Sequence, residues 1–186
     1  MHSVLYLLLK AFITKESRRE DEVKNDEINN YIIMYQERLT KFCCNLCGNY
    51  NDADDLFQET WLKVIRYYDK YDKSKDFGKW LFKICINTYK NNQMSAFNRH
   101  NMIFNSTEEK DIFLSSIPDQ QIKNDNYPEL LRIIRELPDK YRIVLTLRYF
   151  NDYSEKDAAD MLGIPVGTVK SRLNKAKKLI KRRFFI

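Results

Sequence analysis

Four hydrogen-bonding side chains near the carboxyl end of the chain have the spacing of one helix face. They recur at intervals of i, i+3, i+4 and i+7 and are Ser171, Asn174, Lys175 and Lys178. Hydroxyl, amide and ammonium groups of this kind bind the base edges and phosphates of nucleic acid. From Lys170 to the end there are eight Lys or Arg and no Asp or Glu. A basic helix can also be a solvated surface, so the surrounding elements decide between the two interpretations.

The residues around this face predict a helix-turn-helix. A first helix begins at Ser154, which has the spacing of a capping box with Asp157. Gly163 can adopt the left-handed conformation that ends a helix, and Pro165 cannot continue that helix. An apolar stripe gives the second helix an inward face, formed by Val169, Leu173, Ala176 and Ile180. These signals agree with one another, which favours a recognition helix for the major groove of DNA.

An amphipathic helix is predicted over residues 52–68. Its apolar stripe consists of Ala53, Leu56, Phe57, Trp61, Val64, Ile65 and Tyr68. The opposite face carries first acids and then bases, namely Asp52, Asp55, Glu59, Lys63 and Arg66. Acids near a helix start favour the helix dipole, as in many surface helices. The same acids could form a surface for a basic partner, and spacing alone does not decide between these hypotheses.

A polar loop over residues 71–76 precedes another helix, which is expected to begin at Phe77. Aromatic rings interleaved with lysines are typical of surfaces for single-stranded DNA, because bases stack on the rings while ammonium groups meet phosphates. Most of the apolar residues here have helical spacing and are interpreted as core, namely Phe77, Trp80, Leu81 and Ile84. Contacts with a strand are therefore expected from the loop and the exposed lysines.

The cysteines and histidines do not form a complete ligand set for zinc. Cys43, Cys44 and Cys47 lie close in sequence, whereas Cys85 and the only histidines, His2 and His100, lie far from them. A structural zinc site needs four ligands, so the cysteines are interpreted as buried thiols and no metal is expected. The chain also lacks a phosphate-binding glycine motif and a nucleophile–base pair. The sequence therefore predicts no cofactor and no enzyme, and disfavours a zinc-dependent nucleic-acid enzyme.

The composition predicts an all-α protein with two small helical domains. The 186 residues include only 4 Gly and 4 Pro and no run of alternating β-branched residues. We expect an extension, a helical domain, a polar linker and a second helical domain over residues 1–26, 27–95, 96–126 and 127–186. The last part holds 14 Lys+Arg against 7 Asp+Glu, whereas residues 1–126 hold 18 against 19. This charge asymmetry favours two modules with different partners.

The apolar stretch over residues 4–13 does not predict a membrane anchor. It is too short to span a bilayer and is interrupted by Lys10. It lacks the basic start and the small-residue cleavage site of a signal peptide. We expect a cytoplasmic protein without membrane insertion.

Four motifs occur in a known order along the chain. They are Asp52-Ala53-Asp54-Asp55-Leu56-Phe57-Gln58-Glu59-Thr60-Trp61, Phe77-x-x-Trp80-Leu81-x-x-Ile84-x-x-Asn87, Leu137-Pro138-x-x-Tyr141-Arg142 and Gly167-Thr168-Val169-Lys170-Ser171-Arg172-Leu173. Together they closely resemble the extracytoplasmic-function (ECF, group IV) sigma factors of bacterial RNA polymerase, in the sigma-70 family. The resemblance covers about residues 27–95 and 127–186 and implies two all-helical domains, region 2 and region 4, joined by a linker.

The resemblance implies a non-enzymatic subunit that joins core RNA polymerase, recognises the −10 and −35 promoter elements and promotes DNA melting. The coiled coil of the polymerase β′ subunit would be bound by Asp52, Asp55, Gln58 and Glu59. The −10 element, with a flipped base, would meet Tyr71, Asp72, Lys73, Ser74, Lys75, Asp76, Lys79, Trp80 and Asn87. The −35 duplex would meet Gly167, Thr168, Lys170, Ser171, Arg172, Asn174 and Lys175. The implied partners of the monomer are core polymerase (β′ and β subunits), promoter DNA and, as for many relatives, an anti-sigma factor.

The chain departs from the family pattern after Asn87. An acid and paired arginines are usual there, whereas this chain has Tyr89-Lys90-Asn91-Asn92-Gln93-Met94. The difference concerns the phosphate contacts expected at the end of that helix. The alternative hypothesis is a stand-alone helix-turn-helix transcription regulator, in which the acidic helix and the aromatic block are only core.

Overall fold

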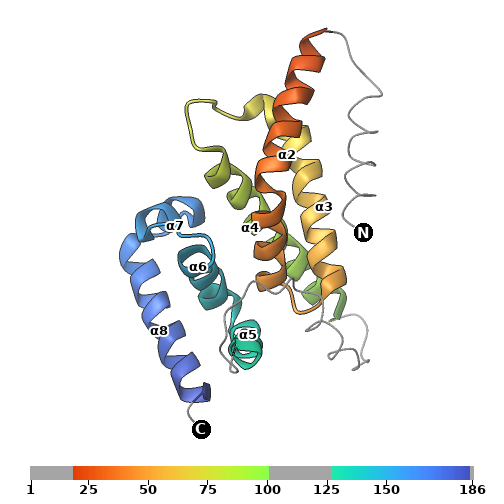
Figure 1. The fold of residues 1–186 in the computed structure, drawn as a ribbon. Helices are drawn as coiled ribbons and strands as arrows, with labels where there is room; N and C mark the ends of the chain where they lie inside the picture. Colours follow the sequence, from red (N-terminus) through yellow and green to blue (C-terminus); the bar gives the residue numbers. More distant parts are fainter. Residues whose placement is uncertain (1–18, 101–126, 185–186) are drawn as a thin grey trace. The chain divides into compact units, whose positions relative to one another are not determined.

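The computed structural model describes residues 19–100 and 127–184, and every regular element in these ranges is a helix (Figure 1). The first part comprises α2 (Arg19–Leu46), α3 (Tyr50–Tyr67), a short 3-10 turn η1 (Tyr68–Lys70) and α4 (Phe77–His100). The second comprises α5 (Tyr127–Arg135), α6 (Asp139–Tyr149), α7 (Glu155–Leu162) and α8 (Val166–Phe184). The all-α prediction is confirmed.

The core of the first domain is formed where α3 packs against α4 and the end of α2. The predicted stripe of α3 is buried at Ala53, Leu56, Phe57, Trp61 and Val64, with Tyr68 buried in η1, and only Ile65 is half-buried. Phe42 of α2 meets Phe82 of α4 edge-on, with ring centroids 4.9 Å apart. Truncating a fully buried ring such as that of Trp61 costs about 3–5 kcal/mol of stability. Packing of this strength holds α3 and α4 in a fixed orientation, so the outward face of each helix is fixed as well.

The second domain is built around α8, against which α5, α6 and α7 pack. Val169, Leu173 and Ala176 are buried, and Ile180 is half-buried against a cluster that includes Leu137 and Leu145. The predicted inward stripe therefore lies where the sequence placed it. The opposite face of α8 is left to solvent.

The predicted start and stop of α7 are both present. Ser154 and Asp157 form the reciprocal capping box, with each side chain accepting from the other residue's backbone N–H. Gly163 ends the helix at φ +64°, a left-handed conformation that costs a non-glycine residue free energy. α8 begins three residues later, which gives the tight turn of a helix-turn-helix.

Parts of the predicted organisation lie outside the described residues. These are residues 1–18, which include the apolar stretch 4–13, and residues 101–126, which make up most of the expected linker. α2 begins inside the expected extension and α4 continues past residue 95, and the domain boundaries stay a prediction. Among the described helices, none is long and apolar enough to cross a membrane.

Candidate nucleic-acid and protein interfaces

The acids at the start of α3 differ in their surroundings. Asp55 is exposed. Asp52 is exposed as well, but it belongs to the helix cap: its N–H donates to the Asn49 side-chain oxygen (2.8 Å), and its carboxylate accepts from the Asn49 amide (2.9 Å). Gln58 is half-buried and donates to Asp54 (2.9 Å). Among the four residues expected to bind a partner here, Asp55 thus presents its carboxylate most openly.

Glu59 instead connects α3 to α4. Its carboxylate accepts from the Asn92 amide (2.8 Å) and pairs with Lys63 (2.8 Å), which in turn donates to Thr88 (3.2 Å). Desolvation raises the pKa of Glu59, but the hydrogen bonds from Lys63 and Asn92 outweigh it, so the pKa lies below its ordinary value. Sequence reasoning assigned Glu59 to a partner surface and missed this role, because Asn92 lies 33 positions away.

The loop over residues 71–76 has a defined conformation made by its own side chains. Lys75 N–H donates to the Asp72 carbonyl (2.9 Å), and Asp72 Oδ1 accepts from the Ser74 N–H (3.0 Å) and hydroxyl (2.7 Å). The hydrogen bonds from Ser74 hold the pKa of the exposed Asp72 carboxyl below its ordinary value. Asp76 accepts from the Lys79 N–H (2.7 Å) at the start of α4. The carboxylates of Asp72 and Asp76 therefore stabilise the conformation of the loop. Lys73 and Lys75 are the exposed cations of this loop.

Aromatic residues lie beneath this loop. Tyr71 is buried, and its ring packs against those of Trp80 and Phe77 with centroids 4.9 Å and 5.4 Å away. Trp80 is half-buried, and Asn87 is exposed further along α4. The interpretation of most of these rings as core agrees with their burial.

Lys79 is half-buried, and its ammonium lies 2.5 Å from Asp157 Oδ1. The hydrogen bond to Asp157 raises the pKa of Lys79 above its ordinary value. A contact between Lys79 and DNA would have to replace this ion pair. Local sequence patterns could not predict this pairing, because it joins residues 78 positions apart.

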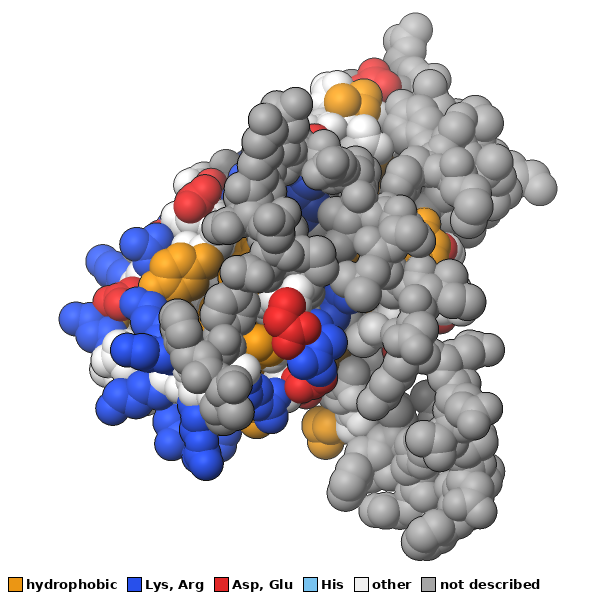
Figure 2. All heavy atoms as spheres, turned by 60° about the horizontal axis from the view of Figure 1, so that its bottom comes forward, with side chains coloured by type: hydrophobic (Ala, Val, Ile, Leu, Met, Phe, Trp, Pro, Cys, Tyr) orange, Lys and Arg blue, Asp and Glu red, His pale blue; other side chains and the backbone are white. Residues whose placement is uncertain are grey.

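The predicted reading face of α8 is exposed at Lys170, Ser171, Asn174 and Lys175. Thr168 and Arg172 are half-buried, and Gly167 is exposed in the first turn with nothing within 4 Å of an added Cβ. The Ser171 hydroxyl donates to the Thr168 carbonyl (2.9 Å), and Lys170 lies 3.8 Å from Glu155. Figure 2 shows Lys and Arg side chains gathered on the side of the view where α8 lies in Figure 1.

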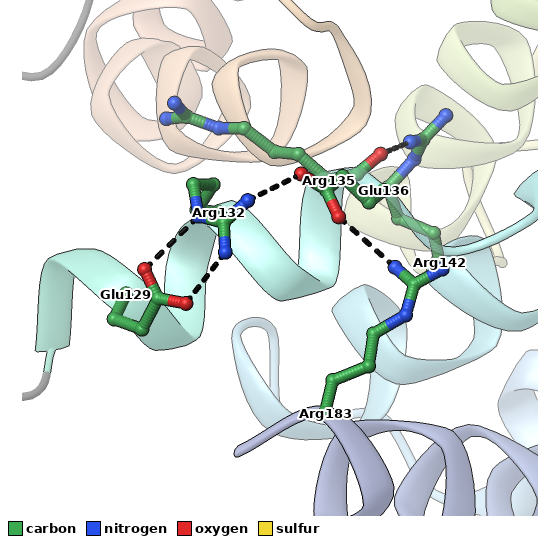
Figure 3. Close-up of polar contacts among 6 residues, drawn as sticks. All are labelled: Glu129, Arg132, Arg135, Glu136, Arg142 and Arg183. Atoms are coloured by element: carbon green, nitrogen blue, oxygen red, sulfur yellow. Dashed lines mark hydrogen bonds and ion pairs between the residues drawn. The ribbon is translucent and has the colours of Figure 1, made fainter. Parts of the chain in front are cut away.

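An ion-pair chain fixes α5 to the end of α8, as Figure 3 shows. Arg132 contacts both oxygens of Glu129 (2.9 and 2.6 Å) and Glu136 (2.7 Å), and Glu136 also accepts from Arg183 (3.1 Å). Arg183, one of the eight basic residues of the carboxyl-terminal run, is therefore held by its own domain. Arg142, part of the third motif, is buried and donates to the carbonyl of Arg135 and to Asp139, which gives it a structural role.

The cysteines lie in the core of the first domain. Cys43, Cys47 and Cys85 are buried and Cys44 is half-buried, with the sulfurs of Cys43 and Cys85 3.8 Å apart. Burial raises the pKa values of Cys43 and Cys47 above the ordinary thiol value. Within the described ranges, no group of three or more His, Cys, Asp or Glu could hold a metal ion. This arrangement is that of apolar core residues.

Two family models match the chain in the order of its two helical domains. Sigma-70 region 2 matches residues 32–95, and Sigma-70, region 4 matches residues 127–180. The chain belongs to the sigma-70 family. It is therefore a sigma factor of RNA polymerase, and this family membership makes it a non-enzymatic subunit.

Curated relatives place this sigma factor in the ECF group. The ECF RNA polymerase sigma factor SigW of Bacillus subtilis is 22% identical over 187 residues, covering 94% of this chain and 98% of the relative. The RNA polymerase sigma-H factor of Pseudomonas aeruginosa is 29% identical, covering 80% and 81%. The ECF RNA polymerase sigma-E factor of Escherichia coli is 27% identical, covering 82% and 83%.

Two solved structures share the fold of this sigma factor. The sigma factor RpoE of Bartonella quintana, solved with the anti-sigma factor NepR, superposes with a TM-score of 0.71 at 22% identity over 86% of this chain and 98% of that one. CnrH, solved with the cytosolic domain of CnrY, superposes with a TM-score of 0.59 at 16% identity over 97% and 95%. At these identities the likeness establishes the fold.

Proposed function

We propose that this sigma factor contacts a promoter at two elements and core polymerase at a third surface, each through a separate group of its residues. α8 reads the −35 duplex through Lys170, Ser171, Asn174 and Lys175, with Gly167, Thr168 and Arg172 at the groove or backbone. The loop over 71–76, with Lys79, Trp80 and Asn87, meets the −10 strand. The start of α3 binds the β′ subunit of core polymerase, and core polymerase also contributes its β subunit to the assembly.

The observation that carries the proposal is the division of α8 into two faces. Val169, Leu173 and Ala176 are buried, while the donors at 170, 171, 174 and 175 are all exposed. A helix held on one side and lined with donors on the other can enter the major groove without rearrangement of its domain. The eight basic residues from Lys170 onward attract the phosphate backbone, although Arg183 is engaged with Glu136.

The proposed contact between the loop over residues 71–76 and the −10 strand is supported by the lysines and aromatic rings at this loop, and not by its aspartates. Asp72 and Asp76 each accept a backbone hydrogen bond, within the loop and from α4 respectively, so these two residues order the loop that carries the lysines. Lys73 and Lys75 are exposed next to an aromatic cluster, a combination suited to a single strand. In this proposal strand separation is driven by capture of unstacked bases and by polymerase contacts.

Regulation by an anti-sigma factor is part of the proposal, and so are a monomeric state and action in the cytoplasm. The two similar solved structures are complexes, one with the anti-sigma factor NepR and the other with the cytosolic domain of CnrY. A shared fold gives this chain a surface of the same general form on which such a regulator could act.

Run-off transcription tests the proposal. The purified chain is combined with bacterial core polymerase and a template library randomised over the −35 and −10 positions. We expect transcripts that depend on the chain and are enriched for defined sequences at both elements. A stand-alone helix-turn-helix regulator would bind duplex DNA but would neither be captured by core polymerase nor start transcripts with it, and that outcome would reject the proposal.

A further inference from the structure

One hydrogen bond reaches the loop over 71–76 from a buried side chain beneath it. The hydroxyl of Tyr71 donates to the carbonyl oxygen of Lys75 (2.5 Å). The Tyr71 side chain is fixed by its environment, since the residue is only 9% exposed and its ring packs against Trp80 and Phe77. The bond therefore ties the far side of the loop to the aromatic core.

The other loop hydrogen bonds described above join residues that are two or three positions apart in the sequence and lie at the surface. Asp72 closes the turn over residues 72–75, and it is exposed there. Asp76 fixes the start of α4 through the Lys79 N–H. Lys75 lies between these two supports, at the point where the Tyr71 hydroxyl holds the backbone. Removing that hydroxyl would let the turn over residues 72–75 open more often and shift relative to α4.

We infer that Tyr71 is a positioning residue for recognition of the −10 strand, acting through the backbone of Lys75. The inference rests on the proposed function of the loop. A loop held in one conformation pays less ordering free energy on binding and fits one base better than another. A loop that shifts accommodates several bases with similar affinity, so the hydroxyl contributes to sequence discrimination more than to the amount of binding.

Tyr71→Phe removes the hydroxyl and keeps the ring packing. The variant is assembled with core polymerase and tested by run-off transcription on the library randomised at the −10 positions. We expect the enrichment of the preferred −10 base over its competitors to fall about 3–10-fold, the effect of losing one hydrogen bond, while enrichment at the −35 positions is unchanged. Tyr67→Phe is the matched control, because it removes the same group from an exposed tyrosine at the end of α3.

Hydrogen exchange of the free protein provides a second measurement that does not require transcription. We expect faster exchange at the Ser74 and Lys75 amides in Tyr71→Phe than in the wild type, with exchange in the α3 and α4 cores unchanged. If the exchange rates at these two amides do not change, the inference is wrong.

The transcription outcomes separate this inference from the proposed function. If Tyr71→Phe lowers transcription equally on all −10 sequences, the hydroxyl serves only stability and the inference is overturned. If both proteins enrich the same −10 bases equally, the inference also fails, but the proposed function stands. If the wild type enriches no base at −10, the assignment of the loop fails and the inference falls with it.

Discussion

Lys170 and Asn174 are the side chains whose loss should reveal base reading most directly, because both are exposed on the outer face of α8. We expect Lys170→Ala or Asn174→Ala to cost about 1–3 kcal/mol on the preferred −35 sequence. The loss should shrink on templates already changed at the contacted base. Lys177→Ala is the control. The Lys177 ammonium lies 5.3 Å from the Tyr149 ring centroid and is not among the residues proposed to read bases. Its loss should therefore weaken DNA binding by a similar factor on all sequences. Binding assays at fixed salt on a set of −35 variants measure these effects.

Glu59 should contribute to stability in a pH-dependent way. Its pKa is lowered by the hydrogen bonds from Lys63 and Asn92, so the stabilisation is fully present above the ordinary pKa of a glutamate and is lost as the pH falls through the lowered folded-state pKa. We expect Glu59→Gln to lower the free energy of unfolding by about 0.5–1.5 kcal/mol at pH 7, a range that allows for solvent screening. The difference in unfolding free energy between Glu59→Gln and the wild type should narrow at acidic pH.

Urea unfolding measures this difference. The control is Asp55→Asn, which is expected to change stability by no more than about 0.5 kcal/mol. Equal losses for both variants would contradict the bridging role of Glu59.

At the scale of helices, replacing two glycines by alanine should change the stability of the second domain in opposite directions. Gly163 ends α7 at φ +64°, so Gly163→Ala should destabilise the second domain by about 1–2 kcal/mol. Gly167 lies inside α8 with nothing within 4 Å of an added Cβ, so Gly167→Ala should stabilise it by about 0.5–1 kcal/mol. Both values come from denaturant unfolding. A destabilised Gly167→Ala would mean that the first turn of α8 does not tolerate a side chain.

Helices were predictable from the sequence where the signals are local, and contacts between distant residues were not. The Ser154 cap, the Gly163 stop and the inward stripe of α8 involve residues within a few positions of one another, and all are present. The bond from Asn92 to Glu59 spans 33 positions and that from Lys79 to Asp157 spans 78. Periodicity carries no information about such pairs, because it states which face a residue occupies and not what lies opposite. As a result, candidate residues were found, but those with structural roles could not be separated from those available for binding.

At the scale of the whole chain, residues 127–186 carry a net charge of +7 and residues 1–126 a net charge of −1. Attraction between Lys or Arg and phosphates weakens with salt, because each phosphate contact releases counterions. We expect binding of the chain to a −35 duplex to weaken steeply between about 50 and 200 mM salt, by about tenfold or more. Fluorescence anisotropy at several salt concentrations tests this. Binding that does not change with salt would contradict phosphate contact by α8.

The opposite charge of the two parts also predicts that polymerase capture and DNA binding can be separated by mutation. Asp55→Lys reverses an exposed charge at the start of α3 without touching the Asn49–Asp52 cap or the Glu59 bridge to α4. We expect it to weaken capture of core polymerase in a pull-down while duplex binding through α8 is unchanged. Glu59→Lys is unsuitable for this purpose, because it would place a cation next to Lys63 and disturb the fold. Lys41→Glu serves as the matched control, since it reverses an exposed charge on α2. If Asp55→Lys and Lys41→Glu reduce capture equally, the acidic start of α3 is not the polymerase-binding surface.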